Sequence, residues 1–429
     1  MKVLLTGATG FIGRHLLRAL LDAGHEVRCA VRDPGAINLP GVQAVAADFM
    51  RDHDEGAWRG HVAGMDAVIN AVGILREEGG QTFDALHVRA PCALFAAAAR
   101  AGVRLVVQIS ALGADANAQS RYHLSKKRAD DFLATLPVAS VILQPSLVYG
   151  NDGASARLFA MLAALPLIPL PGKGGQAVQP VHIDDLCAAV LALLRQAPSG
   201  SRRLAVIGAQ PLALRDYLAL LRKALGMGRG WYVPVPMAAM RLTAGAARFL
   251  PGALVDSETL QMLERGNRGS AEDVARLSRL LGRAPRAPAA FVGDAAPLLA
   301  MRAKLDWLLP LLRVSIALVW IVTGIVSLGL YPVADSYALL ARVGATGLLA
   351  TVLLYGAALL DLAIGIAVLV LRRRPWLWLL QLALIAGYTV IITLRLPEFW
   401  LHPYGPILKN LPLMAAIWIM YEFEKSWNT

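Results

Sequence analysis

The chain has 429 residues, of which 56% are hydrophobic and 17% are charged, and its formal net charge is +12. Soluble globular proteins carry about 25% charged residues, so this composition excludes a disordered or fibrous chain and favours membrane-spanning segments. The length allows two or three domains of about 100–200 residues each. Three cysteines, far apart and outside any metal-binding spacing, are typical of a reducing compartment.

The basic charge is divided between two differently composed parts. Residues 301–429 hold 10 Lys/Arg and 6 Asp/Glu, and the rest of the chain holds 32 and 24. The densest basic run, residues 372–374, lies between two hydrophobic stretches, as membrane flanks do. The sequence has no basic stripe interleaved with aromatic residues, so we expect no nucleic-acid partner. The opening run MKVLLTGATGFIG breaks into glycines at once, which predicts a cytoplasmic N-terminal domain rather than a secretory signal.

Short apolar runs predict the strands of an α/β domain. Helical patterns or loops separate them, and the first helical pattern covers residues 11–24 and ends at a glycine. Such alternation is typical of crossover connections and a parallel sheet, whose ligand binds beyond the carboxyl ends of the strands. The predicted strands are residues 2–7, 25–32, 42–48, 66–73, 104–110 and 140–146.

A glycine-rich loop, TGATGFIG at residues 6–13, follows the first predicted strand. Gly7 permits a tight turn, Gly10 lets the backbone approach a pyrophosphate, and Gly13 lets the next helix pack closely. The amino-terminal end of that helix offers free N–H groups and a partial positive charge to phosphates. The alternative is a glycine-rich turn without a ligand. The order of strand, loop and amphipathic helix predicts a dinucleotide site.

The ends of the next predicted strands indicate which dinucleotide binds. Arg32 ends the second strand, where an arginine accommodates the 2′-phosphate of NADP and an acidic residue would bind the ribose of NAD. We therefore predict a preference for NADPH, with NAD as the alternative cofactor and a solvated charge as the alternative role of Arg32. Asp48 is placed to accept from the adenine amino group, and Asn70 and Gly73 are placed to line the cofactor.

A tyrosine and a lysine, Tyr122 and Lys126, are four residues apart and so project from one helix face. A lysine ammonium favours the phenolate of a nearby tyrosine, and it can also hold the nicotinamide ribose. Ser110 ends the preceding strand and is placed to bond a substrate carbonyl. Tyr421 and Lys425 have the same spacing, so the spacing alone is weak evidence. Tyr122 and Lys126 are supported instead by their position after a strand of the cofactor domain. The alternative is a surface helix whose lysine binds the cofactor and on which no residue takes part in catalysis.

Five segments together resemble the short-chain dehydrogenase/reductase superfamily: TGATGFIG, residues 109–115, the Tyr122–Lys126 pair, QPSLVYG at 144–150 and residues 178–190. They are most similar to its atypical branch, which includes the nucleotide-binding accessory subunit of respiratory complex I. The resemblance covers about residues 1–295 and implies a Rossmann fold, NAD(P), and catalytic roles for Ser110, Tyr122 and Lys126. Loop pattern and resemblance together give these cofactor contacts: Gly7, Thr9, Gly10, Phe11, Ile12, Gly13, Arg32, Asp48, Asn70, Gly73 and Lys126.

Two departures from the family pattern bear on the substrate. Gln144 stands where many relatives carry an arginine before proline. The interval of 12 residues between Ser110 and Tyr122 lacks the longer loop of sugar-nucleotide epimerases, which argues against a nucleotide-sugar substrate. Some members of this branch hold NADPH permanently without turnover, so the resemblance leaves a non-catalytic role open.

The sequence divides into a Rossmann domain at residues 1–210, a helical cap or linker at 211–300, and a transmembrane domain at 301–429. The middle part is basic and broken by Pro and Gly. Its helices suit a substrate-side cap or a surface lying on the bilayer. Trp231, Met237, Met240 and Phe249 are candidates to touch lipid or line a pocket, and packing in a core is the alternative.

Four hydrophobic stretches predict a transmembrane four-helix bundle, at about residues 311–331, 346–371, 375–395 and 406–422. About 20 helical residues cross a hydrocarbon core of ~30 Å. The fourth contains Lys409, Asn410 and Pro412, and its alternative is an interfacial helix. Basic residues before the first stretch and between the second and third predict cytoplasmic flanks. We therefore expect a multi-pass protein of a bacterial-type inner membrane, with the N-terminal domain and the C-terminus in the cytoplasm.

The third part resembles a DoxX-like membrane domain in PLLR (310–313), TGIVSL (323–328), Asp361 with Gly365, and HPYGPILKNLP (402–412). Asp361 is a candidate functional residue because an intramembrane carboxylate is costly and faces a bundle interior or a wet cavity. Its partner is left open among Arg313, Arg342, Arg395 and His402. The alternative role is a helix-to-helix hydrogen bond that stabilises the bundle.

Three functions are compatible with these patterns. The first is a membrane-anchored NADPH-dependent oxidoreductase acting on a lipophilic carbonyl or quinone, with Tyr122 as acid, Lys126 as electrostatic helper and Ser110 orienting the substrate. The second is a non-catalytic NADPH-holding scaffold or assembly factor in a membrane protein complex. The third is an epimerase or dehydratase that regenerates its cofactor. No metal site is predicted.

Overall fold

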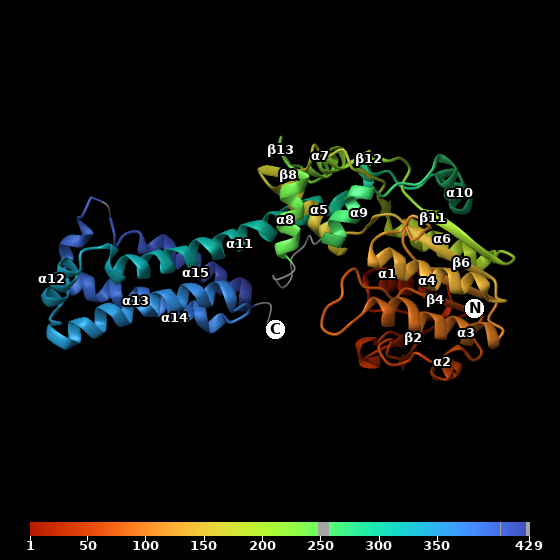
Figure 1. Ribbon diagram of the computed structural model, residues 1–429, viewed down its shortest axis with the longest axis horizontal. Coiled ribbons are helices and arrows are strands. Elements are labelled where there is room, and N and C mark those ends of the chain that lie inside the picture. The colour runs from red at the N-terminus through yellow and green to blue at the C-terminus, as the bar shows by residue number, and fades with distance from the viewer. Residues whose placement is uncertain (248–256, 404, 426–429) are drawn as a thin grey trace. The chain divides into compact units, whose positions relative to one another are not determined.

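The computed structural model describes residues 1–247, 257–403 and 405–425. The chain divides into two compact units, Met1–Ala303 and Lys304–Thr429, each described by itself below (Figure 1). Phe249, one of the residues considered for lipid contact, lies outside the described residues.

A seven-stranded sheet forms the centre of the first unit, in the order β11-β6-β5-β4-β1-β2-β3, and every neighbouring pair is parallel. Six of these strands lie within the predicted runs, whereas β11 was not predicted. The strands are β1 (Lys2–Thr6), β2 (Glu26–Val31), β3 (Val42–Ala46), β4 (Ala67–Asn70), β5 (Leu105–Ile109), β6 (Ser140–Pro145) and β11 (Ser201–Val206).

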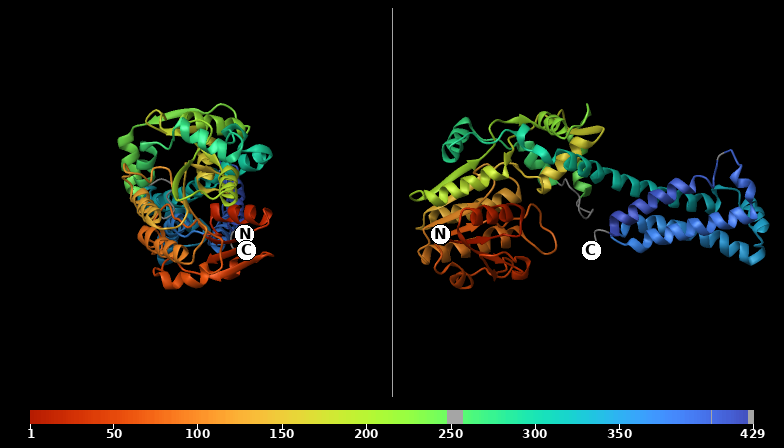
Figure 2. Two further views of the ribbon diagram at one scale, coloured as in Figure 1. Left: turned by 90° about the vertical axis from the view of Figure 1, so that its right-hand side faces the viewer. Right: turned by 180° about the vertical axis from the view of Figure 1, so that it is seen from behind.

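Helices cover both faces of this sheet, as Figures 1 and 2 show. Alternate residues of a strand point to opposite faces, so Val3 and Leu5 pack in one buried cluster and Leu4 in the other. The first face carries α1 (Phe11–Asp22), α6 (Ile183–Arg195) and α10 (Ala271–Leu281). The second face carries α2 (Glu55–Val62), α3 (Ala90–Arg100) and α4 (Arg121–Thr135).

The strand order reverses between β1 and β4, because β2 and β3 extend the sheet on one side of β1 and the later strands on the other. Open parallel sheets bind their ligands at such a reversal, beyond the carboxyl ends of the strands. The glycine-rich loop follows β1 and lies at this position.

A second, smaller core lies above the carboxyl ends of the strands and contains Ile168, Tyr217 and Phe291. The region was predicted to be partly helical, and it also contains three two-stranded sheets. Its elements are β7 (Val148–Tyr149), α5 (Ala154–Ala164), β8 (Leu167–Pro171), β9 (Ala177–Val178), β10 (Val181–His182), β12 (Leu212–Ala213), α7 (Leu214–Ala224), β13 (Trp231–Val235), α8 (Met237–Ala247) and α9 (Ser257–Arg265).

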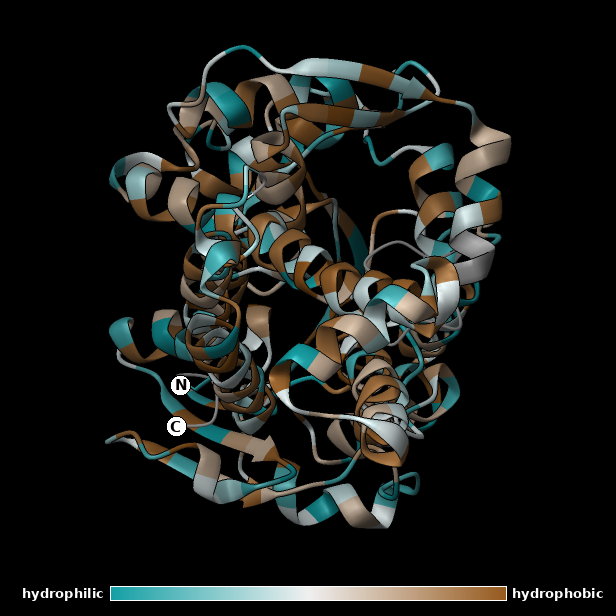
Figure 3. Cartoon of the chain, turned by 90° about the vertical axis from the view of Figure 1, so that its left-hand side faces the viewer, coloured by the Kyte–Doolittle hydropathy of each residue, from teal (hydrophilic) through white to brown (hydrophobic). Residues whose placement is uncertain are grey.

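The second unit is helical, and many of its exposed large side chains are hydrophobic, among them Leu318, Leu359 and Leu380. Figure 3 colours the residues of the chain by hydropathy. A helix that is apolar on all sides is typical of a membrane span. Among the described residues, three helical segments are long and apolar enough to cross a membrane: Gly293–Leu330, Gly347–Val370 and Pro375–Arg395. The helices are α11 (Ala296–Ile325), which begins in the first unit, α12 (Val333–Val343), α13 (Gly347–Val370), α14 (Pro375–Arg395) and α15 (Asn410–Lys425).

The fourth predicted stretch corresponds to α15, whose 16 residues give a length of about 24 Å, shorter than a hydrocarbon core of ~30 Å. A short additional helix, α12, lies between the first and second long helices. The fold class itself, a Rossmann-like parallel-sheet domain followed by a helical region with apolar helices, is confirmed. The predicted domain limits remain predictions.

Candidate functional site

The glycine-rich loop packs so closely that only glycine fits at two of its positions. Gly7 has a φ of +73°, and a Cβ there would lie 2.7 Å from the carbonyl carbon of Ala71 at the end of β4. A Cβ on Gly13 would lie 1.9 Å from the carbonyl oxygen of Gly7. Gly10 precedes α1 and donates its N–H to the Gly7 oxygen at 2.9 Å. The amino-terminal end of α1 is thereby presented at the reversal of the strand order.

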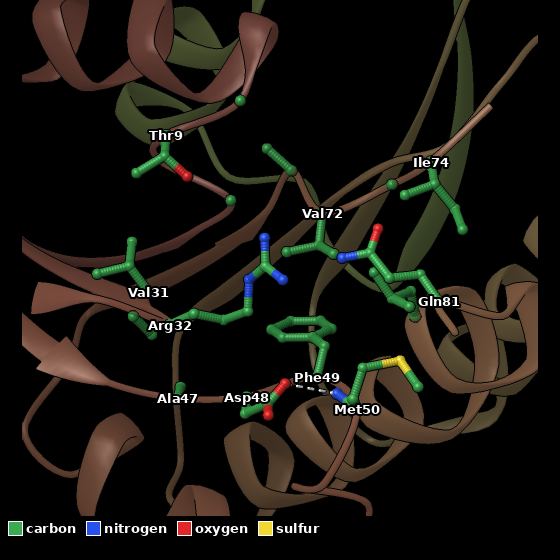
Figure 4. Close-up of a pocket in the computed structure, with 16 residues that line it drawn as sticks. Thr9, Val31, Arg32, Ala47, Asp48, Phe49, Met50, Val72, Ile74 and Gln81 are labelled. Atoms are coloured by element: carbon green, nitrogen blue, oxygen red, sulfur yellow. Dashed lines mark hydrogen bonds between the residues drawn. The ribbon is translucent and has the colours of Figure 1, made fainter. Parts of the chain in front are cut away.

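A cavity of about 180 Å³ lies between this loop and the ends of β2, β3 and β4 (Figure 4). The structure brings six of the predicted cofactor residues around it: Gly7, Thr9, Gly10, Arg32, Asp48 and Gly73. Sequence reasoning missed the apolar part of its wall, which includes Phe49, Met50, Ile74 and Leu86. Phe49, Met50 and Ile74 come from loops, where no periodic pattern marks a buried residue, and Leu86 lies in the short helix Asp84–Arg89.

Three other predicted contacts lie elsewhere. The ring of Phe11 packs against Gly150, where a Cβ would lie 2.8 Å from the ring. Ile12 packs against the core beneath the sheet. Asn70 is fully buried and belongs to a hydrogen-bonded row across the strand ends, accepting from Thr6 at 2.6 Å and donating to Gln108 at 2.8 Å. Like Gly13, these residues position the strand ends and α1.

Arg32 is exposed and its guanidinium extends into the cavity, above the ring of Phe49 (Figure 4). Asp48 is turned toward its own loop, since its carboxylate accepts the N–H of Met50 at 2.9 Å and lies 3.6 Å from Arg51. Within the described parts of the chain, Arg32 makes no ion pair, so its charge is available to a ligand phosphate.

Replacing Arg32 by alanine should weaken NADPH binding by about 10–100-fold and NADH binding by less than about 3-fold, because only NADPH carries the phosphate that a charge-assisted bond would hold. The two dissociation constants are measured by titration of the full-length protein in detergent. Arg28→Ala is the matched control, because Arg28 lies on the same strand but donates to Gln43 at 2.8 Å and to the His61 carbonyl at 2.9 Å. Equal losses of NADPH and NADH affinity in Arg32→Ala would contradict the predicted contact between Arg32 and the 2′-phosphate.

Helix α4 presents Tyr122, Lys126 and Asp130 at four-residue intervals, and all three side chains are buried. The ammonium of Lys126 donates to the carbonyl oxygens of Val72 and Ile109, each at 3.1 Å. An ammonium has three N–H donors, so one remains for a ribose hydroxyl. Burial lowers the pKa of Lys126 to about 8, against the opposing effect of the Asp130 charge.

Tyr122 lies in an apolar cluster with Phe83 and Ala111, against which Ile74 and Met262 also pack. Burial, and secondarily the Asp130 charge, raises the pKa of Tyr122 to about 12. The sequence predicted that Lys126 favours the phenolate form of Tyr122. Burial has the opposite effect, because it raises the pKa of the phenol. The phenol is therefore neutral near pH 7, which suits it to donate a proton.

Ser110 points away from the cavity, because its hydroxyl donates to the carboxylate of Asp130. Asp130 is fully buried, and its Oδ1 atom has no hydrogen-bond partner among the described residues. Burial raises the pKa of Asp130 to about 6, although Ser110 and Lys126 oppose the rise. Sequence reasoning missed Asp130, and the signal that could have found it is its position four residues after Lys126.

His87 is a second buried residue that sequence reasoning missed. Its Nε2 atom accepts the N–H of Ile74 at 3.0 Å, and its Nδ1 atom lies 2.8 Å from the Ser125 hydroxyl, which itself donates to the Tyr122 carbonyl at 2.7 Å. This network assigns the ring proton to Nδ1. Burial, with the Lys126 charge, lowers the pKa of His87 to about 2. The neutral imidazole of His87 thus links Ile74, which lines the cavity, to Ser125 on α4.

Asp130→Asn should move the alkaline limit of kcat/KM to lower pH by about one unit. The negative charge of Asp130 raises the pKa of both Tyr122 and Lys126, and activity that needs both groups protonated is lost once pH exceeds the lower of the two values. Removing the charge lowers both. The measurement is a pH profile of NADPH-dependent reduction, with Asp131→Asn as control because Asp131 pairs with Lys127 and Arg203 at the surface. An unchanged profile would contradict the coupling.

Helix α9 packs against the Tyr122 cluster. Glu258 accepts the backbone N–H of Tyr122 at 3.3 Å, and Met262 packs on the Tyr122 cluster. Arg265 donates to the Gly113 carbonyl and to Asp115, each at 2.7 Å. Polar contacts thus hold α9 near both of its ends, and Met262 between them packs on Tyr122.

In the second unit, Asp361 lies on α13 and is buried, and its Oδ1 atom has no hydrogen-bond partner among the described residues. Two of its proposed partners are engaged elsewhere, since Arg313 pairs with Glu424 and Arg342 pairs with Glu398. Where the structure describes the chain, no three His, Cys, Asp or Glu side chains gather as a metal-binding group.

Comparison with known proteins gives one family match in each of the two units. Residues 7–161 match the model of an NAD(P)H-binding family, and residues 317–418 match the DoxX-like family. A ceramide reductase of Caulobacter vibrioides is 28% identical over 205 residues, which are 45% of this chain and 61% of that protein. The mitochondrial NADH dehydrogenase [ubiquinone] 1 alpha subcomplex subunit 9 of Arabidopsis thaliana is 27% identical over 253 residues, 57% of this chain and 62% of that protein.

The alignments thus span about three fifths of the length of these relatives. Among solved structures, a nucleoside-diphosphate-sugar epimerase from Staphylococcus aureus superposes with a TM-score of 0.56 at 17% identity, covering 68% of this chain and all of that one. This likeness shows the fold. The chain thus combines an NAD(P)H-binding part and a DoxX-like part, as both resemblances predicted.

Proposed function

We propose that this chain is a membrane-anchored, NAD(P)H-dependent reductase that converts a carbonyl of a lipophilic substrate to an alcohol. The observation that carries the proposal is Tyr122, a neutral phenol buried on the same helix as Lys126, in an apolar cluster that packs against Ile74 of the cavity wall. The reductase relative and the NAD(P)H-binding match support an oxidoreductase.

The residues around the cavity fit a nicotinamide dinucleotide. The close approach of Gly7 to Ala71 leaves backbone N–H groups facing the reversal of the strand order, and Arg32 supplies a cation at the far side. Lys126 keeps one N–H donor for a ribose hydroxyl. We propose NADPH as the preferred cofactor because of Arg32, with NADH as the alternative.

When bound, the reduced nicotinamide supplies a hydride to the carbonyl carbon. The phenol of Tyr122 donates its proton to the carbonyl oxygen, so the C=O bond becomes an alcohol without a net charge. Lys126 stabilises the phenolate that this transfer leaves, and the carbonyl oxygens of Val72 and Ile109 hold its ammonium in place. Ser110 is free to donate to the substrate only when Asp130 is protonated, because the ionised carboxylate accepts the hydrogen bond of the serine hydroxyl.

A lipophilic substrate is supported by two independent features. Around Tyr122 the side chains of Phe83, Ala111, Ile74 and Met262 are apolar, and such a wall would exclude water from an acyl or isoprenoid chain. The same polypeptide carries three helical segments able to cross a membrane, which would keep the site near lipids.

We propose a bacterial-type inner-membrane location with the first unit in the cytoplasm. Arg302, Lys304 and Arg313 precede the first long hydrophobic stretch, and residues 372–374 separate α13 from α14. Both basic groups belong on the cytoplasmic side, and two crossings between them make the assignments consistent.

The test uses the full-length protein in nanodiscs, with NADPH oxidation and product formation followed together. Long-chain ketolipids are offered against quinones and a short water-soluble ketone. We expect one alcohol formed per NADPH oxidised and a higher kcat/KM for the long-chain ketone. Quinone reduction alone would move the proposal to a quinone reductase, and absence of turnover with every acceptor would overturn it.

A second candidate, a nucleotide-holding subunit of a membrane protein complex, is favoured by the likeness to a subunit of NADH dehydrogenase. It predicts NADPH that co-purifies with the protein and a partner lost when the glycine-rich loop is broken, without turnover. An epimerase or dehydratase would instead form product without net NADPH consumption.

A further inference from the structure

Two short strands outside the candidate site form a ribbon whose outer face is apolar. β8 and β13 pair in parallel, with Leu167 beside Trp231 and Pro169 beside Val233. Because alternate residues share a face, these four side chains lie together. All four are exposed, Trp231 by 76%, Leu167 by 60% and Val233 by 42%. Figure 1 shows both strands at the edge of the first unit, next to α8.

This face departs from the usual pattern of a half-buried sheet. The opposite face of β8 carries Ile168 and Leu170, which are buried in the smaller core. An antiparallel or two-stranded sheet with one face in water normally alternates apolar and polar residues. Here LIPLP and WYVPV contain no charged residue at all. The outer face therefore has the composition of a surface that is covered.

Prolines make another protein strand a poor occupant of the ribbon edges. Pro169 and Pro171 lie in β8, Pro234 lies in β13, and Pro236 follows it. Proline lacks the N–H that a sheet ladder needs, and natural proteins use it to block edge-to-edge pairing. The face remains open to a partner that needs no backbone hydrogen bonds.

The charges around the ribbon select a negative partner. Residues 153–183 and 217–247, which contain β8, β13, α5 and α8, include no Asp or Glu and hold two and four Lys/Arg, respectively. Of these, Arg241 pairs with Glu264 of α9 and Arg222 donates to the carbonyl oxygens of Ala163 and Leu165. The exposed basic side chains just beyond the ribbon are Arg229, before β13, and Lys173, after β8. Basic residues beside exposed apolar side chains are complementary to anionic lipid headgroups and the acyl boundary below them.

The chain itself limits how far the ribbon can lie from a bilayer. Ala300, at the start of α11, packs against the same core as Ile168 and Leu170. Arg313, the last basic residue before the hydrophobic part of α11, follows 13 residues later. Thirteen residues span at most about 45 Å even when fully extended. The chain thus limits the distance between Ala300, which packs on the core beneath the ribbon, and the basic flank of the hydrophobic segment.

We propose that the outer face of the β8–β13 ribbon binds the surface of an anionic bilayer, with Trp231 at the headgroup level. Tryptophan favours this position because its ring is apolar while its N–H stays hydrated. The contact turns the reductase unit from a tethered domain into one that lies on the lipid. It does not depend on hydride transfer and stands whether or not turnover occurs.

The test places a nitroxide on the full-length protein in nanodiscs of phosphatidylcholine with phosphatidylglycerol. Trp231→Cys carries the label, and Leu39→Cys is the control because Leu39 is also an apolar residue, 45% exposed, on the loop before β3. Cys29 and Cys187 are buried, and Cys92 is replaced by serine in both variants. Retained NADPH binding shows that each labelled variant is folded.

Electron paramagnetic resonance then compares collisions of the label with oxygen, which partitions into lipid, and with a water-soluble nickel chelate. At position 231 we expect oxygen to relax the label at least threefold more effectively relative to nickel than at position 39, with a smaller ratio in discs of phosphatidylcholine alone. Equal ratios at the two positions would overturn the proposal. Spin–spin broadening between labels at position 231 would overturn it too, by assigning the face to a second copy of the chain.

Discussion

Replacing Tyr122 by phenylalanine should lower kcat for carbonyl reduction by about 10²–10⁴-fold, while NADPH binding changes by less than about 3-fold. The substitution removes one oxygen atom, and the ring contacts with Phe83 and Ala111 remain. A large fall in kcat with unchanged nucleotide affinity therefore measures the loss of the proton donor. Steady-state NADPH oxidation and nucleotide titration on the same preparation give both quantities.

The chain offers a matched control in Tyr421, which is also followed by a lysine four residues later. The ammonium of Lys425 lies 5.6 Å from the centre of the Tyr421 ring, so this pair reproduces the local chemistry on α15. Tyr421→Phe should leave kcat unchanged. If Tyr122→Phe also matched the wild type with every active acceptor, the phenol would not be the acid and the scaffold hypothesis would gain support.

Gly13→Ala should weaken NADPH binding by more than about 100-fold and destabilise the first unit by about 1–3 kcal/mol, since overpacking displaces backbone. The added methyl group would lie 1.9 Å from the Gly7 oxygen, 2.6 Å from the Gly7 carbon and 2.9 Å from the Ala8 Cα atom. All three are backbone atoms, so α1 must move away from the loop that holds the phosphates. Titration with NADPH and thermal unfolding give the two effects.

Gly60→Ala is the control for the same substitution within a helix. A Cβ at Gly60 in α2 meets no atom within 4 Å, so this variant should be neutral or more stable by about 0.5–1 kcal/mol. NADPH affinity should not change in Gly60→Ala. Tight NADPH binding by Gly13→Ala would show that the dinucleotide is not held by this loop.

Together the two experiments separate the proposed functions. The Gly13 variant tests whether a nucleotide binds at the strand-order reversal, which both the reductase and the scaffold require. The Tyr122 variant tests proton donation, which only catalysis requires. Loss of binding in the first with wild-type behaviour in the second would identify a nucleotide-holding subunit.

Much of the fold could be predicted because its signals are local. The run at residues 2–7, the glycine loop and the helical pattern from residue 11 became β1, the turn and α1 within one or two residues. β11 escaped prediction because its sequence SRRLAV begins with three exposed polar residues, as an edge strand does. The helix of the fourth predicted span begins only at Asn410, so α15 has 16 residues, fewer than the roughly 20 that cross a hydrocarbon core.

The sequence by itself determined the parallel-sheet class, the presence of apolar helices in the last third of the chain and which residues stand at strand ends, because periodicity, glycine placement and hydropathy act over a few neighbouring residues. Only the tertiary structure decided where the polar groups of those residues go. Asn70 is hydrogen-bonded to Thr6 across 64 residues, His87 to Ser125 across 38, and Ser110 donates a hydrogen bond to Asp130 across 20. Such partners meet only when helices and strands from distant parts of the chain pack together, and burial then fixes the protonation of Tyr122, Lys126 and Asp130.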